Sequence, residues 1–70
     1  MTERGLLKLL DQHFWPPVHV TGGDYSYDGW LIAVFRKREF KGDHEPKVRC
    51  VVEDACHRLF IHNPKQVKPR

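Results

Sequence analysis

Hydrophobic and polar residues alternate along two stretches in the second half of the chain, residues 47–53 and 58–62. Successive side chains of a strand point to opposite faces, so this alternation predicts two strands that pair as a hairpin. One face of this hairpin is expected to carry Val48, Cys50, Val52, Leu59 and Ile61. The other is expected to carry Arg49, Val51, Glu53, Arg58, Phe60 and His62. The second face would therefore combine cations with an aromatic ring.

The N-terminal segment has the spacing of a helix. Its apolar residues recur every three or four positions and define one stripe, made of Leu6, Leu7, Leu10 and Phe14. Thr2 can cap the helix, and Pro16 and Pro17 cannot continue it, so we expect it to end by about Phe14. Residues 1–15 are thus predicted to be a short helix with its cap, lying on the rest of the domain.

Turn residues divide the remaining chain into short strands. Residues 18–21 are expected to be extended before Gly22 and Gly23, and a tight turn is expected at Asp28-Gly29. Residues 30–36 read as a strand that is apolar on both faces and therefore buried from both sides.

A polar loop over residues 37–46 follows, in which Phe40 is expected to fold back onto the domain. The second hairpin is expected to close through residues 54–57, with Glu53 as the cross-strand partner of Arg58. Residues 65–67 are expected to form one helical turn, and 68–70 a frayed basic tail.

These elements predict one α+β domain over residues 1–70. A short N-terminal helix would pack on a three- to five-stranded, mostly antiparallel sheet, the meander of residues 18–67, that curls toward a barrel. Seventy residues bury a thin core, and oligomerisation is a common remedy for the marginal stability that results.

A series of short motifs accompanies the expected strands between residues 28 and 67. They are Asp28-Gly29-Trp30, Ala33-Val34, Val51-Val52-Glu53-Asp54 and, after a tight turn, Leu59-Phe60-Ile61. This series resembles the small SH3-like barrels of the Tudor and KOW kind. The resemblance implies a binding module, and a Tudor-type aromatic cage would draw on Trp30, Tyr25 and Tyr27. The plasmid-type (type II) dihydrofolate reductase has the same architecture, but its Val-Gln-Ile-Tyr motif would align on residues 59–62, which lack that glutamine and tyrosine.

Charge is distributed unevenly along the chain. Residues 1–35 carry a net charge of −2, whereas residues 36–70 carry +5. A basic half indicates an anionic partner such as nucleic acid, with cations on the phosphates and an aromatic ring under a base. The expected nucleic-acid surface consists of Arg36, Lys37, Arg38, Lys47, Arg49, Arg58, Phe60 and His62.

Protein association is the alternative function, because the sheet has more apolar positions than one short helix covers. Its expected contact residues are Trp30, Leu31, Phe35, Val51 and Phe60, and a homo-oligomer is one form it could take. The two functions differ in salt dependence: phosphate contacts weaken as salt rises, whereas an apolar interface holds or tightens.

Other chemistry is not expected. Cys50 and Cys56 are expected to be free thiols of a cytoplasmic protein, and the histidines lack the spacing of a metal site. The chain shows no signal peptide and no apolar run long enough for a membrane span. Since no acid, base or nucleophile pattern converges, we expect neither catalysis nor a cofactor.

Overall fold

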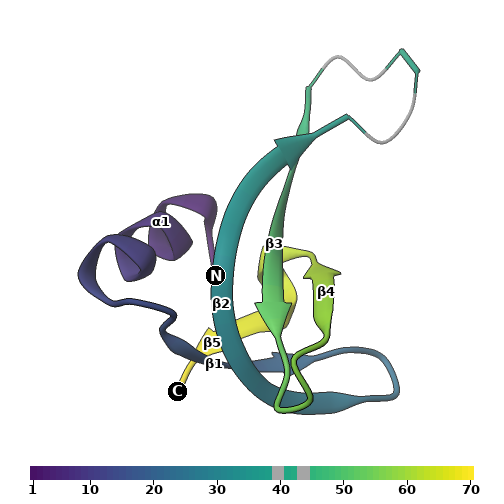
Figure 1. Cartoon of the computed structure of the whole chain (residues 1–70). Coiled ribbons are helices and arrows are strands. Elements are labelled where there is room, and N and C mark those ends of the chain that lie inside the picture. The colour runs from purple at the N-terminus through teal and green to yellow at the C-terminus, as the bar shows by residue number, and fades with distance from the viewer. Residues whose placement is uncertain (39–40, 43–44) are drawn as a thin grey trace.

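One N-terminal helix packs on a five-stranded antiparallel sheet, as expected for an α+β domain (Figure 1). The computed structural model describes residues 1–38, 41–42 and 45–70, so the position expected for Phe40 lies outside the described residues. The elements in chain order are α1 (Glu3–Gln12), β1 (Pro17–Thr21), β2 (Ser26–Lys37), β3 (Lys47–Glu53), β4 (Leu59–His62), a 3₁₀ turn (Pro64–Gln66) and β5 (Val67–Pro69).

The strand order across the sheet is β4-β3-β2-β1-β5. Within the described part of the chain the sheet curls without closing into a barrel, which leaves β4 and β5 as its two edges. The long strand β2 produces the curl, because its first half pairs with β1 and its second half with β3. Trp30 sits at the junction, opposite both Pro17 and Glu53, and a bulge lies between Leu31 and Ala33.

The prediction of a tight turn at Asp28-Gly29 is wrong. Both residues lie inside β2, opposite His19 and Val18, and the chain reverses earlier, between β1 and β2. Gly29 is needed for packing instead: a Cβ on it would lie 2.5 Å from the carbonyl oxygen of Glu53. Glycine therefore permits the backbones of β2 and β3 to approach closely where the sheet bends.

The hairpin of β3 and β4 is present, but the expected sorting of its side chains is wrong. Cys50 lies opposite His62 and Val52 opposite Phe60, whereas Val51 lies opposite Ile61 and Glu53 opposite Leu59. Because directly opposed residues share a face, Phe60 and His62 lie with the core residues. Leu59 and Ile61 lie with Arg49, Val51 and Glu53 on the other face.

The turn between these strands explains the shift. The Asp54 carboxylate accepts hydrogen bonds from the backbone N–H of both Cys56 and Arg58, at 2.9 Å each. His57 takes a φ of 63°, in the left-handed region. Arg58 therefore stays in the turn, β4 starts one residue later than expected, and every side chain of β4 changes face. The ion pair expected between Glu53 and Arg58 is replaced by one from Asp54 to Arg58, at 2.9 Å.

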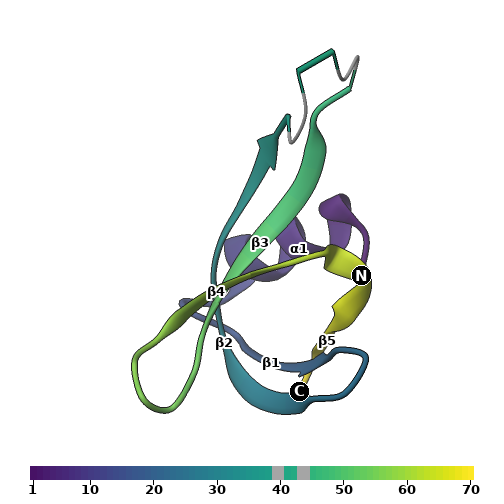
Figure 2. The same cartoon turned by 90° about the vertical axis from the view of Figure 1, so that its right-hand side faces the viewer.

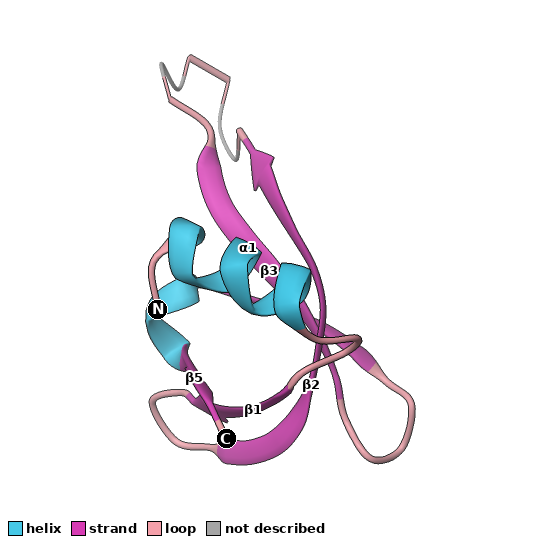
Figure 3. Ribbon diagram, turned by 90° about the vertical axis from the view of Figure 1, so that its left-hand side faces the viewer, coloured by secondary structure: helices cyan, strands magenta, loops and turns pink. Residues whose placement is uncertain are grey.

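The core is small and lies inside the curl of the sheet. Its fully buried residues are Leu6, Val18, Val20, Leu31, Cys50, Val52 and Val67. Figures 2 and 3 view the molecule from opposite sides, with β4 in front of β2 in Figure 2 and α1 in front of β2 in Figure 3. The helix thus lies across one end of the curled sheet and inserts Leu6 into the core.

The helix buries a different stripe from the one expected. Leu9 and Leu10 pack beside Leu6, while Leu7 is 50% exposed and Phe14, beyond the end of α1, is 97% exposed. Contacts at the start of the chain fix this rotation. The N-terminal amine donates to the carbonyls of Pro64 and Val67, and Glu3 forms a bidentate ion pair with Arg36.

The C-terminal tail is ordered, contrary to the expected fraying. Val67–Pro69 forms β5, which pairs with β1 and places Lys68 opposite His19. The backbone N–H of Arg70 donates to the carbonyl of Pro17. The 3₁₀ turn precedes β5 one residue earlier than expected, with Asn63 as its cap. Val67 consequently enters the core, and both ends of the chain are tied to the sheet.

Candidate functional site

Two hollows flank the hairpin of β3 and β4, one on each face of the sheet. We call the face that carries Arg49, Val51, Glu53, Leu59 and Ile61 the outer face. On β2 it continues through Trp30, Ala33 and Phe35, which lie opposite Glu53, Val51 and Arg49. The opposite, inner face carries the core residues together with Phe60 and His62.

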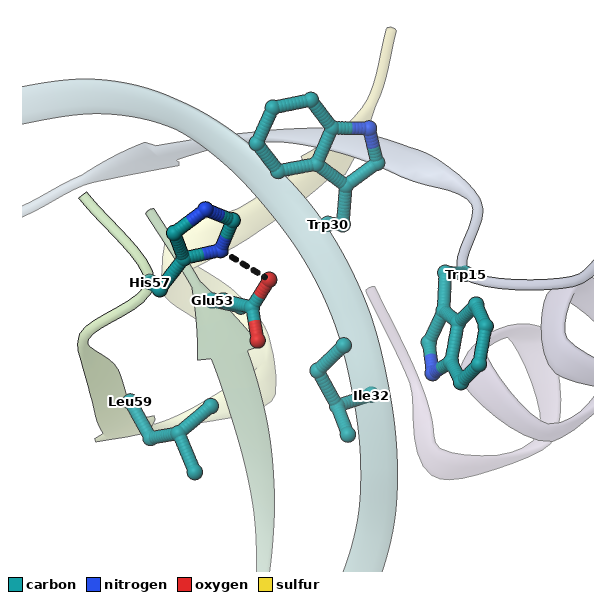
Figure 4. A pocket seen from close by; sticks show the side chains of 6 residues that line it. All are labelled: Trp15, Trp30, Ile32, Glu53, His57 and Leu59. Atoms are coloured by element: carbon teal, nitrogen blue, oxygen red, sulfur yellow. Dashed lines mark hydrogen bonds and ion pairs between the residues drawn. The ribbon is translucent and has the colours of Figure 1, made fainter. Parts of the chain in front are cut away.

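The outer hollow lies at one end of the outer face (Figure 4). It has a volume of about 620 Å³ and is lined by Trp15, Trp30, Ile32, Glu53, His57 and Leu59. Trp15, from the segment after α1, has a positive φ of 42°. Two polar side chains line the hollow, His57 and Glu53, and Nδ1 of His57 lies 3.4 Å from the Glu53 carboxylate. The Arg70 guanidinium lies 5.9 Å from the centre of the Trp30 ring.

The outer face is strongly apolar and open. Trp30, Leu59 and Ile61 are exposed by 37, 60 and 61%, and Val51, Ile32 and Phe35 are half-buried. The helix packs against the inner face, so it does not cover these side chains. Cations stand at the far end of the same face, where Arg49 lies opposite Phe35 and Lys37 opposite Lys47.

The inner hollow has a volume of about 550 Å³ and aromatic walls. It is lined by Tyr25, Ser26, Tyr27, Asp54, Arg58, Phe60, Ile61 and His62. The ring centroids of Tyr27 and Phe60 are 5.8 Å apart, and those of Tyr25 and Tyr27 6.4 Å apart. Gly22 has no side chain, and this gives the Tyr25 ring its place, because a Cβ there would lie 2.2 Å from the ring.

His62 holds the aromatic residues of the inner hollow together. Its Nε2 hydrogen-bonds to the Tyr27 hydroxyl at 2.5 Å, and its Nδ1 lies 3.5 Å from the Tyr25 hydroxyl. The side-chain amide of Gln66 donates to that same Tyr25 hydroxyl. Burial lowers the pKa of His62 and raises the pKa of Tyr27 to about 12, so both groups are uncharged at neutral pH.

Arg58 and Asp54 form the charged rim of the inner hollow. The Arg58 guanidinium lies 5.7 Å from the centre of the Phe60 ring, and its Nε donates to the Asp54 carboxylate. Hydrogen bonds, first of all from the backbone N–H of Arg58, hold the pKa of Asp54 below its usual value. Both carboxylate oxygens of Asp54 are therefore engaged within the turn.

The expected nucleic-acid surface is divided by this arrangement. The structure brings Arg58, Phe60 and His62 together in the inner hollow. Lys37, Lys47 and Arg49 lie on the other face at the far end of the hairpin, Arg36 binds Glu3, and Arg38 is exposed beyond β2. Arg49 and Phe60 thus point in opposite directions, and the prediction of one continuous basic and aromatic face is wrong.

The expected protein-binding residues divide in the same way. Trp30, Phe35 and Val51 lie on the outer face, whereas Leu31 is buried in the core and Phe60 lines the inner hollow. Sequence reasoning missed Trp15, Ile32, Leu59 and Ile61. The sequence signal for Leu59 and Ile61 is Asp54, because an aspartate at the start of a turn can accept hydrogen bonds from the N–H groups two and four residues later. Such a turn includes Arg58, and the strand then begins at Leu59.

Both cysteines are free, Cys50 in the core and Cys56 at the surface of the turn. In the described part of the chain no three histidine, cysteine, aspartate or glutamate side chains gather into a possible metal site. None of the described helices is both long and apolar enough to cross a bilayer. The chain matches no family model, no curated protein and no solved structure.

Proposed function

We propose that this chain is a non-catalytic binding module that associates with a second copy of itself through the outer face. The observation that carries the proposal is the uncovered run of Trp30, Leu59 and Ile61, with Val51 between the strands that bear them. A contiguous exposed apolar patch of this kind, bordered by polar groups, is typical of a protein interface.

Aliphatic side chains favour a protein over a nucleic acid as the partner. Leucine and isoleucine offer no ring for base stacking and no charge for phosphate, yet they occupy the most exposed positions of β4 on this face. The cations of the same face lie at one end of it, Arg49 level with Phe35 and Lys37 and Lys47 beyond it. An apolar centre with a charged periphery matches the usual anatomy of a protein–protein interface.

The charges along β3 make the outer face complementary to itself. Arg49, Val51 and Glu53 succeed one another on this face, with the cation and the anion equally spaced about the valine. A two-fold axis that lies in the plane between the two sheets and crosses β3 at right angles beside Val51 would set Arg49 of each copy against Glu53 of the other. Symmetric dimers require such a patch, in which one residue contacts a second and the second contacts the first.

A second copy also suits the size of the domain. Among the residues that the structure describes, the core cluster has seven members, and four of them are valines. Small domains with thin cores commonly gain stability from association. Burial of the outer face would place β2 and β3 between two apolar layers, which accords with their apolar residues on both faces.

The two tryptophans of the chain, Trp15 and Trp30, both line the outer hollow and report on its burial. Dilution of the parent chain is expected to shift their emission to longer wavelength as the outer face becomes exposed. Leu59→Asp introduces a charge at the interface once per copy, and we expect it to weaken association by more than about 3 kcal/mol. Its emission should already be at the long-wavelength position at high concentration.

Leu7→Asp is the matched control, because it makes the same change at a half-exposed leucine on α1. It should follow the parent dilution curve. An emission wavelength that is independent of concentration in the parent would contradict the proposal, as would equal curves for the parent and Leu59→Asp.

We also infer that the sheet belongs to the SH3-like class of the Tudor and KOW modules. The strand order β4-β3-β2-β1-β5 and the 3₁₀ turn before a final strand led by Val67 support this inference. Backbone chemical shifts and long-range distance restraints from NMR test it, since they would show whether β4 and β5 approach each other across the 3₁₀ turn in solution.

A further inference from the structure

We propose that the inner hollow binds a planar heteroaromatic ring that carries a phosphate, as in a nucleotide, with Phe60 and Tyr25 as stacking surfaces and Arg58 as the phosphate ligand. This site lies on the opposite face from the proposed interface and does not depend on it. The source of the nucleotide, free in solution or part of a single strand, is distinguished by the experiment below.

The walls of the hollow suit a flat ring. Phe60 and Tyr25 keep 38 and 45% of their surface exposed, so their rings are accessible to a ligand. The hollow's volume, about 550 Å³, lies within the range of 300–1,000 Å³ of small-molecule sites. Aromatic side chains bind nucleobases by stacking without preference for one base.

The position of Tyr27 adds a polar contact to the floor. Its hydroxyl is held by the buried imidazole of His62, which is 7% exposed. The pair is uncharged at neutral pH, so it can exchange hydrogen bonds with the edge of a base without repelling or attracting charge. Ser26, which also lines the hollow, supplies a further hydroxyl.

The charges of the rim distinguish this ligand from an organic cation. An aromatic cage for an alkylammonium group gains from a carboxylate that is free to face the cation. Here the Asp54 carboxylate is engaged by the turn, and the charged group at the rim beside Phe60 is the guanidinium of Arg58. A ligand cation would meet the charge of Arg58, whereas an anionic group is attracted by it.

Arg58 is placed to bind a phosphate. Its side chain is 68% exposed, and its Nε and Nη2 are fixed by Asp54 at 2.9 Å each. A guanidinium has five N–H donors, so donors remain for a phosphate while the group is held in position. A preorganised arginine beside an aromatic surface is the arrangement that a phosphorylated base requires.

The experiment titrates the full chain with adenosine monophosphate, adenosine and a short oligodeoxyadenylate, followed by NMR chemical-shift changes. We expect adenosine monophosphate or the oligonucleotide to perturb residues 25–27 and 58–62, and adenosine to bind more weakly. Phe60→Leu keeps an apolar side chain but removes the ring, and it should weaken binding roughly 5- to 150-fold. Arg58→Gln should reduce the preference for the phosphorylated ligand.

Leu7→Ala is the control, because Leu7 is a half-exposed leucine of α1 that lines neither hollow, and it should leave ligand affinity unchanged. Tighter binding of the oligonucleotide than of the mononucleotide identifies a single strand as the source, and equal binding identifies the free nucleotide. For the oligonucleotide, a single phosphate contact predicts that the logarithm of the affinity falls with the logarithm of salt concentration with a slope of about −0.7.

Three results would overturn the inference. One is the absence of any shift change with all three ligands at millimolar concentration. Another is equal affinity for adenosine and adenosine monophosphate, which would exclude Arg58 as a phosphate ligand. The third is unchanged binding in Phe60→Leu, in a sample whose spectrum shows that the variant is folded.

Discussion

At the scale of single residues, Asp54 determines how both faces of the hairpin of β3 and β4 are composed. Its carboxylate accepts two backbone N–H groups and pairs with Arg58, and so it sets the length of the turn. The turn length then decides which side chains of β4 face outward. A single acidic side chain therefore places Leu59 on the outer face and Phe60 in the inner hollow.

We predict that Asp54→Asn lowers the free energy of unfolding at neutral pH, because the charge that these N–H groups and Arg58 stabilise is lost. The pKa of Asp54 is lowered in the native state, so its contribution is complete above the unfolded value of about 3.9 and disappears as pH falls below it. Urea unfolding of the parent and the variant should differ at pH 7 and converge toward pH 2.

Asp11→Asn is the control for this change, since it makes the same substitution at an exposed aspartate of α1, outside the turn. It should unfold almost as the parent does. Equal stability of Asp54→Asn and the parent at pH 7 would contradict the role given to Asp54.

His62 makes a second prediction at this scale. Burial lowers its pKa, so the native state resists a proton that the unfolded chain accepts near pH 6.5. The free energy of unfolding should therefore fall as pH is lowered from 7.5 to 5.5. Denaturant unfolding should show a smaller fall in His62→Gln, while His13→Gln, at an exposed position, should show the fall of the parent.

At the scale of elements, β2 determines the architecture, because its first half pairs with β1 and its second half with β3. Gly29 lies where the strand passes from one neighbour to the other. Its lack of a side chain lets β2 approach the backbone of Glu53 and the side chain of Val52.

We predict that Gly29→Ala lowers the free energy of unfolding by about 1–3 kcal/mol, because the new methyl group would lie 2.5 Å from a backbone oxygen. Gly23→Ala is the matched control, since nothing lies within 4 Å of its Cβ position. Thermal unfolding followed by circular dichroism measures both. A loss in Gly23→Ala as large as that in Gly29→Ala would refute the packing role of Gly29.

Periodicity predicted the elements well and their connections less well. The alternation of Val48, Cys50 and Val52 identified β3 and its buried side, and the spacing of Leu6 and Leu10 identified α1. Which side chains of β4 face outward depends on the residue at which the strand begins. Asp54 sets that residue through the turn, and the alternation of polar and apolar residues does not reveal it. Asp28-Gly29 is typical of a tight turn, but glycine also occurs where two backbones approach closely, and Gly29 has that role here.

Long-range contacts account for the remaining differences. Residues 68–70 are polar and basic, which is typical of a frayed end, yet pairing with β1 and the contact of Arg70 with Asp28 order them. The N-terminal amine, bonded to carbonyls more than sixty residues away, fixes the rotation of α1. No local pattern records either contact.

At the scale of the whole molecule, the chain exposes more surface than a compact monomer of its mass. Its accessible area is 5279 Å², against about 4,600 Å² expected for 8.3 kDa. A typical interface buries about 800 Å² per partner, an area similar to this excess. Association would bring the exposed area close to the usual value.

The self-complementary charges yield a prediction for the assembled molecule. Arg49→Glu sets like charges together at both ends of the interface and should weaken association, as should Glu53→Arg. The double variant restores opposite charges and should recover most of the affinity, which sedimentation equilibrium would measure. Failure of the double variant to recover would exclude the axis through Val51.

The most direct test of the central claim is the mass of the unmodified chain in solution, measured by light scattering over a range of concentrations at low and high salt. The proposed interface predicts a mass that rises from 8.3 kDa toward twice that value with concentration, and a rise that salt preserves or strengthens. A mass of 8.3 kDa at every concentration up to millimolar, in both buffers, would contradict self-association through the outer face.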